Sequence, residues 1–377
     1  MLARRTTIDA AGRTLYDRLP LNGSHLGSQE LGVTFCEEAA DMHGNRTYAY
    51  IAPEPAEGEE APERSRFTTL VLFEVGSAAQ GTHFGAAPAK LSSQAFDDNY
   101  SKSHRPRIGG RCPTGASEAV ANAFQNAQAV LDSIRAKHEE QEQEQGESWD
   151  VKEAVLSSTG DPSNVDVIEF CLPPLYMLPA TQANTGPRTP AGTPRKRVNK
   201  ASTTVDLDAP PTESNAEPPV LRHVKDVADR AIGDKYAPSI LMDHEGAFFQ
   251  QEKAYCVQAD VRDGLGLIAP NELGEKLDEG TLVIATVALM TYVMPYANPR
   301  KDRDGSVKVG RKIYQVQIER LRVLDGGNGA PFVYTPPTIV APPSPVKRAR
   351  NTTVDTAFDE FEPEAQAGPS KKKGRRT

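Results

Sequence analysis

Hydrophobic residues in this chain gather in two stretches, and the segments around them carry few large apolar side chains. The first stretch spans residues 31–178 and the second spans residues 220–328. Segments that lack enough apolar surface to bury remain unfolded. The pattern therefore predicts two folded islands, with a flexible start over 1–30, a disordered linker over 179–219 and a disordered tail over 329–377.

The first island shows patterns typical of strands and of one long helix. Residues 47–52 and 67–75 are rich in β-branched and aromatic side chains, which favours strands. Residues 117–138 carry apolar side chains at intervals of three and four, which places them on one stripe of a helix. We expect this stripe to pack in a core, with a protein partner as the alternative, and residues 138–142 to form a solvated helix end. The stripe consists of Val120, Phe124, Ala127, Leu131 and Ile134.

The second island is predicted to be β-rich, with an opening helix over 220–231 and long strands over 281–293 and 313–324. Apolar positions in the last strand shift phase by one residue at Glu319 and Arg320, which indicates a β-bulge. A helix, several strands and a bulged hairpin suit a small, partly open barrel, and the oligonucleotide-binding (OB) type is one candidate. A sheet with a helix and no closure is the alternative. The predicted fold class is α+β, with two small islands, the second OB-like.

Composition narrows the classes of function. The formal net charge of −8 argues against binding a polyanion over the whole surface, so any contact with nucleic acid must be local. Four cysteines lie far apart without the close spacing of zinc ligands, so we expect free thiols and no metal site. No cofactor is predicted. No apolar run reaches the length of a membrane-spanning helix, so no membrane partner is expected either.

The loop between the two long strands is the strongest local candidate for binding chemistry. Residues 300–312 hold six basic and two acidic side chains, which leaves a local charge of +4, and tyrosines flank the loop. Loops and exposed aromatic rings hold single-stranded nucleic acid in OB-type barrels. The alternative is a solvated hairpin tip with the tyrosines, including Tyr314, in the core. The candidate contact residues are Arg300, Lys301, Arg303, Lys308, Arg311, Lys312, Tyr292 and Tyr296.

Three basic clusters lie in segments that we predict to be disordered. Exposed basic runs are typical of nuclear import signals, so the clusters predict binding to an import receptor and a nuclear location. Thr193 and Ser344 each precede a proline just ahead of a cluster, and phosphorylation there by a proline-directed kinase would offset the basic charge. The cluster residues are Arg195, Lys196, Arg197, Lys347, Arg348, Arg350, Lys371, Lys372, Lys373, Arg375 and Arg376.

Two further motifs resemble functional sites only in part. Residues 110–117 match a phosphate-binding loop except that Ala116 replaces the lysine, which carries the charge that holds the phosphates. Asp243, His244 and Glu245 offer ligand atoms, but adjacent residues in a turn do not all face one metal, so we expect turn chemistry. No catalytic residue is predicted.

Three stretches, His104–Cys112, Gln251–Asp260 and Arg311–Val316, resemble a family of proteins from mushroom-forming (basidiomycete) fungi. That family pairs such an N-terminal block with such a C-terminal block. The resemblance implies that both islands are folded units, and it brings no activity and no site residues with it.

Together these observations predict a nuclear, non-enzymatic binding protein that holds single-stranded nucleic acid through its second island. The alternative is a protein-interaction scaffold that uses the helix over 117–138 and is regulated by proline-directed phosphorylation. An enzyme ranks third, because no constellation of residues supports one.

Overall fold

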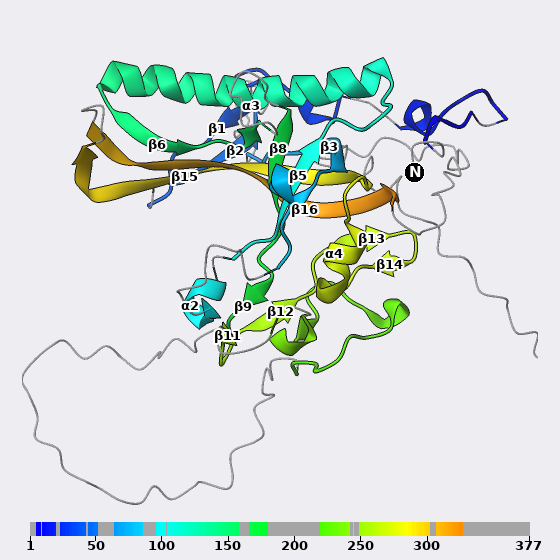
Figure 1. The fold of residues 1–377 in the computed structure, drawn as a ribbon. Helices are drawn as coiled ribbons and strands as arrows, with labels where there is room; N and C mark the ends of the chain where they lie inside the picture. The colour runs from blue at the N-terminus through cyan, green and yellow to red at the C-terminus, as the bar shows by residue number, and fades with distance from the viewer. Residues whose placement is uncertain are drawn as a thin grey trace, which may run out of the picture.

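A computed structural model shows an α+β fold in which strands outnumber helices (Figure 1). It describes residues 5–8, 10–19, 23–42, 44–51, 64–85, 96–102, 104–157, 166–179, 219–241, 244, 249–301 and 307–326. The helices are α2 (Asp98–Ser101), α3 (Glu118–Gln145) and α4 (Leu273–Lys276). The strands are β1 (Phe35–Glu37), β2 (Arg46–Tyr50), β3 (Thr68–Val75), β4 (Phe96–Asp97), β5 (Arg107–Arg111), β6 (Ser148–Lys152), β7 (Val155–Leu156), β8 (Val167–Cys171), β9 (Tyr176–Met177), β10 (Lys235–Tyr236), β11 (Phe249–Gln250), β12 (Tyr255–Val257), β13 (Val261–Asp263), β14 (Gly266–Leu267), β15 (Leu282–Lys301) and β16 (Val307–Asp325).

Five strands of the large sheet pair in a closed cycle. β3 pairs with β5, β5 with β8, β8 with β16, β16 with β15, and β15 returns to β3. Only the β8–β16 pairing in this cycle is parallel. If β3, β5, β8, β15 and β16 are counted as strands one to five in chain order, their order around the cycle is 1-2-3-5-4. β1 and β2 extend the sheet beyond β15, and β6, β13 and β14 extend it beside β16.

The two predicted islands do not form separate sheets. β3, β5 and β8 come from residues 31–178, whereas β15 and β16 come from residues 220–328, and these strands hydrogen-bond to one another. β15 is apolar on both faces in its first half, so it needs neighbours from the first segment to cover it. Both segments therefore contribute to one core.

Side chains from one face of the five strands fill the inside of the cycle. Phe73 and Phe170 stack there with ring centroids 4.1 Å apart. Gly110 lies against both rings, and a Cβ atom on it would approach Phe170 to 2.4 Å. Glycine at this position therefore allows the close approach of β5 to the stacked rings. The buried aliphatic side chains of this core include Val71, Val75, Ile108, Ile168, Val283, Ala285, Val287, Val316, Ile318 and Leu321.

The long β15–β16 hairpin contains the β-bulge that the sequence predicts. Thr286 pairs with Arg320, but the next residue, Val287, pairs with Ile318, so Glu319 is left without a partner across the ladder. The extra residue shifts the phase of the apolar positions and returns Leu321 to the buried face. The prediction from the pattern is confirmed.

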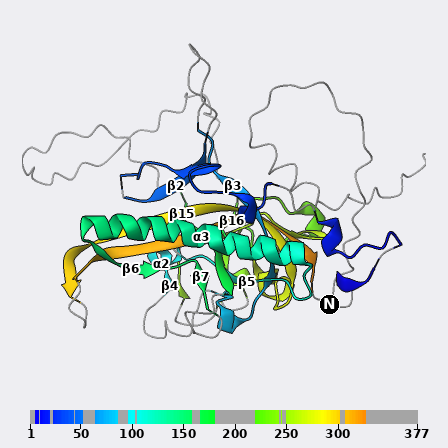
Figure 2. The same cartoon turned by 90° about the horizontal axis from the view of Figure 1, so that it is seen from above.

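Helix α3 lies across one face of the sheet, as the view from above shows (Figure 2). Its predicted stripe, including Phe124 and Ile134, is buried in the core, so the stripe is covered within this chain. The helix continues to Gln145, beyond the predicted end, and His138 and Glu142 are only 2% and 6% exposed. The expectation of a solvated end was wrong for these two side chains, which have partners on the sheet below, whereas Glu139 and Glu140 between them are exposed as expected.

A smaller lobe lies on the side of the sheet opposite α3 (Figure 1). It contains the three-stranded sheet β10-β12-β9 and a parallel pair of β4 and β11. Phe96, Tyr176 and Tyr236 form its core. The helix expected over 220–231 is absent from this described stretch apart from one 3-10 turn, Val227–Asp229. The chain there instead runs along the lobe, with Leu221 bridging to β10.

Candidate nucleic-acid interface

Lys312 does not belong to an exposed basic loop. It lies on the face of β16 that α3 covers, and its Nζ donates to Glu142 Oε1 at 2.8 Å. The same ammonium group lies 4.7 Å from the centroid of the Trp149 ring. Both charged side chains are largely buried. Lys312 therefore fixes the C-terminal part of α3 to the hairpin, and its prediction as a contact residue was wrong.

Tyr314 is also a core residue. Its hydroxyl lies 2.8 Å from His138 Nδ1, and Nε2 of that histidine lies 2.8 Å from Glu37 Oε1. Burial raises the pKa of Tyr314, so the phenol stays neutral. Burial would also raise the pKa of Glu37, but hydrogen bonds from His138 and Arg46 outweigh it and hold that pKa below its usual value. This buried chain of polar groups is a second anchor for α3.

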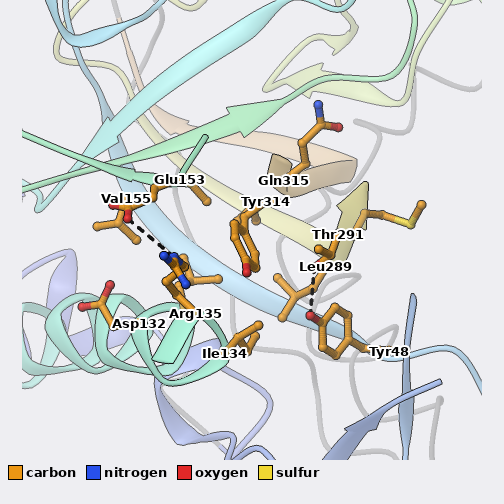
Figure 3. A pocket seen from close by; sticks show the side chains of 14 residues that line it. Tyr48, Asp132, Ile134, Arg135, Glu153, Val155, Leu289, Thr291, Tyr314 and Gln315 are labelled. Atoms are coloured by element: carbon orange, nitrogen blue, oxygen red, sulfur yellow. Dashed lines mark hydrogen bonds and ion pairs between the residues drawn. The ribbon is translucent and has the colours of Figure 1, made fainter. Parts of the chain in front are cut away.

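A cavity of about 50 Å³ lies between α3 and the hairpin (Figure 3). Leu131, Leu289 and the rings of Tyr48 and Tyr314 line it, and Arg135 stands at its edge. The Tyr48 hydroxyl lies 3.0 Å from Thr291 Oγ1, and burial raises its pKa. Phenols of raised pKa do not act as bases near neutral pH. The polar groups of the cavity therefore hold the helix in place, and we assign no chemistry to them.

The opposite face of the hairpin carries the remaining aromatic and basic candidates. Val293 and Lys312 pair with each other, and their side chains lie on the α3 side of the hairpin. Side chains alternate along a strand, so the residues on either side of each of these two point away from α3. Tyr296 shows this geometry: its hydroxyl donates to Asp150 Oδ2 at 3.3 Å, and the Arg300 guanidinium lies 4.4 Å from its ring centroid. We call this surface the open face. It consists of Tyr292, Met294, Tyr296, Arg300, Arg311 and Ile313.

Side chains on the open face are more exposed to solvent than Lys312 and Tyr314 on the α3 side. Arg300 and Arg311 are exposed, and Tyr292 and Tyr296 are half-buried. Their rings are thus held by neighbouring strands while part of each surface stays in water. An aromatic ring fixed in this way beside a guanidinium group can stack on a flat heterocycle, since arginine also stacks on aromatic planes.

Strand pairing connects the open face to β8 and β5, although Cys171 of β8 is itself buried. Cys171 of β8 pairs with Arg107 on one side and with Gln317 on the other, and Gln317 Nε2 donates to the Tyr292 hydroxyl at 2.8 Å. Arg107 is 45% exposed and reaches Glu169, which also pairs with Lys152. Burial raises the pKa of Cys171 even though Arg107 and Lys152 act to lower it. Arg107 of β5 and Lys152 of β6 therefore share Glu169 as a partner, and Gln317 links this group to the aromatic part of the hairpin.

Sequence reasoning did not select Arg107 or Lys152 as contact residues. The two lie 45 positions apart in the chain and far from the hairpin, and only strand pairing brings them beside Tyr292. The one available signal was the basic stretch His104–Arg111, which precedes and enters β5.

The other predicted residues have mixed placements. Lys308 Nζ donates to Ser148 Oγ at 2.9 Å, and Lys301 is exposed at the end of β15. Arg303, the three import clusters, and Thr193 and Ser344 lie outside the described residues. The loop that resembles a phosphate site uses its backbone internally, since Thr114 N donates to Glu74 Oε2 at 3.1 Å.

Comparison of the chain with protein-family models, with curated proteins and with solved structures found no match. The resemblance to a fungal family therefore stays a prediction. Within the described part of the chain, no group of three or more histidine, cysteine, aspartate or glutamate residues is arranged to hold a metal ion. All four cysteines are free thiols. None of the helices among these residues is long and apolar enough to cross a membrane.

Proposed function

We propose that this protein binds single-stranded nucleic acid along the open face and across the adjoining basic residues Arg107 of β5 and Lys152 of β6. The observation that carries the proposal is the arrangement around Tyr296. Its ring is stacked by Arg300 and lies on the same face as Tyr292 and Arg311, away from α3. Aromatic side chains beside cations bind successive bases and phosphates of a single strand without a need for a fixed sequence.

The strand cycle supports the same function. A five-stranded barrel of the OB type binds oligonucleotides on the face of its second and third strands and on the loops between strands 1–2 and 4–5. In the cycle described above, the second and third strands are β5 and β8, and the connection between strands four and five is the outer part of the β15–β16 hairpin. The proposed interface joins these two places. The OB-like barrel is thus part of the proposal, and it uses both segments of the chain.

The proposed interface carries basic side chains that can attract nucleic acid, although the net charge of the whole chain is −8. The interface carries Arg107, Lys152, Arg300 and Arg311, and the acids in contact with its residues include Glu169 and Asp150. Each phosphate that such a cation neutralises contributes a slope of roughly −0.7 to the dependence of log K on log salt. Binding should therefore be strongly weakened by salt.

The test uses the full chain and a fluorescent mixed-sequence oligonucleotide of about 12 nucleotides, a length within the usual site sizes of roughly 4–16. We expect the double variant Arg107→Ala/Arg311→Ala to reduce the affinity about tenfold and to make the salt slope shallower by about 1.4. Lys137→Ala is the matched control, because this exposed lysine lies on α3, on the other side of the sheet. Equal affinity of the double variant and the control, or binding that salt leaves unchanged, would sink the proposal.

Stacking is tested separately at Tyr296. Alanine there should reduce the affinity by about 1–3 kcal/mol, the usual contribution of one stacked base. Phenylalanine keeps the ring and loses only the exposed hydrogen bond to Asp150, so it should bind almost as the natural chain does. A loss of equal size in both variants would show that the ring does not stack.

The scaffold alternative relied on the apolar stripe of α3 as a binding surface for a partner protein, but Val120, Phe124 and Leu131 are buried in the core of this chain.

The nuclear location stays a prediction from the basic clusters. Removal of all three clusters should leave a fluorescently tagged protein in the cytoplasm, and continued nuclear accumulation would contradict the prediction.

A further inference from the structure

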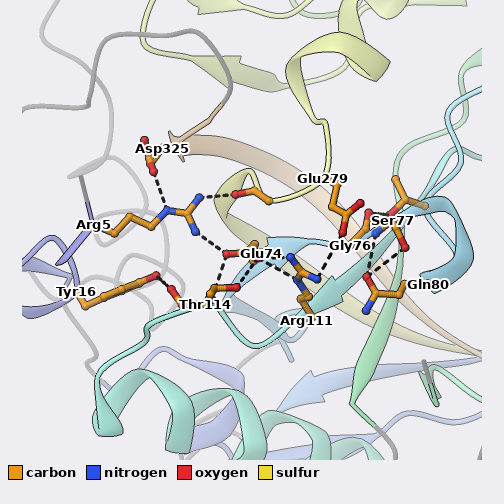
Figure 4. Close-up of polar contacts among 12 residues, drawn as sticks. Arg5, Tyr16, Glu74, Gly76, Ser77, Gln80, Arg111, Thr114, Glu279 and Asp325 are labelled. Atoms are coloured by element: carbon orange, nitrogen blue, oxygen red, sulfur yellow. Dashed lines mark hydrogen bonds and ion pairs between the residues drawn. The ribbon is translucent and has the colours of Figure 1, made fainter. Parts of the chain in front are cut away.

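An arginine close to the start of the chain is buried against β3 and the end of β16. Arg5 is 1% exposed. Its Nη1 donates to Glu74 Oε2 at 2.5 Å, its Nε donates to Asp325 Oδ2 at 2.7 Å, and its Nη2 donates to the carbonyl oxygen of Gly280 (Figure 4). Three acceptors from three separate elements therefore surround one guanidinium group.

The segment around Arg5 is buried at its two ends, at Arg5 and at Leu15–Tyr16. Leu15 N donates to the Arg5 carbonyl oxygen at 3.1 Å, which closes residues 5–15 into a loop. The described residues from Thr6 to Arg13 are exposed, and Ile8 is 65% exposed. Leu15 and Tyr16 are buried, and the Tyr16 hydroxyl donates to the Thr114 carbonyl oxygen at 2.8 Å. Their apolar partners on the sheet are Leu70, Leu72, Leu282, Ile284 and Leu324.

We propose that the outer side of β3, β15 and the end of β16 is a peptide-binding site that selects arginine, and that residues 5–19 are its ligand within the chain. The same segment of a second copy of this chain is the partner that fits the site in trans. The ligand class is a peptide that presents a guanidinium group together with an adjacent apolar and aromatic pair.

The geometry of the acceptors explains the selection of arginine. The guanidinium group offers donors in a planar fork, so Nε, Nη1 and Nη2 each meet a different acceptor. A lysine ammonium group is a point charge on a flexible stem and does not reach Glu74, Asp325 and the Gly280 carbonyl in one plane. Replacement of the arginine by lysine should therefore weaken binding almost as much as its removal.

The site also requires a cation, because its two carboxylates are buried. Burial acts to raise the pKa of Glu74, but hydrogen bonds from Thr114, Arg111 and Arg5 hold that pKa below the usual value. Glu74 therefore stays ionised at neutral pH. Arg111 supplies Nε and Nη2 to the Oε1 atom, and Arg5 adds a donor to the Oε2 atom, which also accepts from Thr114 N, and a donor to Asp325 Oδ2. Without Arg5, Glu74 keeps only Arg111 as a cationic partner at 2.6 Å and Asp325 loses the donor from Arg5 Nε, and loss of a partner in a buried place is unfavourable, so a filled site is preferred.

The experiment separates the segment from the body of the protein. A protease recognition sequence replaces residues 20–22 in the full chain, the released segment is removed after cleavage, and a fluorescent peptide of residues 1–19 is then titrated against the cleaved protein. We expect saturable binding of the natural peptide. The Arg5→Ala and Arg5→Lys peptides should bind at least tenfold more weakly, and an Ile8→Ala peptide, altered at the exposed tip, should bind as the natural one does.

A second measurement uses the uncleaved chain. The full-length Arg5→Ala variant has lost the anchor of its own segment, so it should bind the natural peptide, whereas the natural full chain should bind it at least tenfold more weakly because its site is filled. Each of three results overturns the proposal: equal binding of the Arg5→Ala and natural peptides, no binding to a cleaved protein with an intact circular dichroism spectrum, or unfolding of the cleaved protein when the segment leaves. None of these results depends on nucleic acid.

Discussion

Arg311 and Lys312 are neighbours in the sequence and belong to the same predicted basic loop, yet substitution of each should have a different effect. Lys312 is paired with Glu142 beneath α3, and these two side chains are 10% and 8% exposed. Arg311 points to the opposite face and is exposed. Comparison of variants at Arg311 and Lys312 therefore tests directly which face of β16 is exposed to solvent.

Removal of one partner from a buried ion pair costs about 3–5 kcal/mol of folding free energy, because the other charge stays buried without compensation. Both side chains keep 8–10% of their surface in contact with solvent, so we expect Lys312→Ala to lie near the lower end, about 3 kcal/mol. For a protein of this size that corresponds to a melting temperature lower by roughly 6–12 °C. Arg311→Ala should change stability by no more than about 0.5 kcal/mol.

The assay is thermal and urea unfolding of the full chain, followed by circular dichroism, for both single variants and for the double variant Lys312→Met/Glu142→Met. Replacement of both partners by apolar side chains leaves no unpaired charge, so most of the lost stability should return. A Lys312→Ala protein as stable as the Arg311→Ala protein would refute the placement of Lys312 under the helix. So would a double variant that is no more stable than Lys312→Ala.

Three further results are expected. Gly110→Ala should destabilise the protein by about 1–3 kcal/mol, because its methyl group would collide with two stacked rings, whereas Gly264→Ala, with open space around it, should change little in the same unfolding assay. The pKa of Glu74 is lowered in the fold, so the stability that its ionised form contributes is complete above the ordinary value of 4.5 and is lost as the pH falls through the lower pKa of the folded state. Glu74→Gln should therefore make the slope of unfolding free energy against pH shallower below pH 4.5, and an unchanged slope would contradict this. His138→Ala removes a hydrogen-bond partner from the buried Tyr314 hydroxyl and one of the partners of Glu37, and should cost about 1–3 kcal/mol, so a variant as stable as the natural chain would show that the histidine is not an anchor.

Local patterns were enough to predict several elements of this fold. The period of apolar residues predicted α3 and its buried stripe, and a shift of phase predicted the bulge at Glu319. Both signals depend on neighbours within one helix or one strand, so they are present in the sequence itself. The same reasoning failed at His138 and Glu142, because polar residues at a helix end are usually solvated and their partners are far away in the chain.

The sequence by itself determined the α+β class, the long hairpin and the presence of basic and aromatic side chains near its tip. Only the tertiary structure decided which side of the hairpin lies under α3, and so which of two adjacent cations is exposed. It also decided that β3, β5 and β8 close a cycle with β15 and β16. The physical reason is that strand pairing depends on backbone hydrogen bonds between distant segments, and these bonds leave no periodic mark on either segment alone.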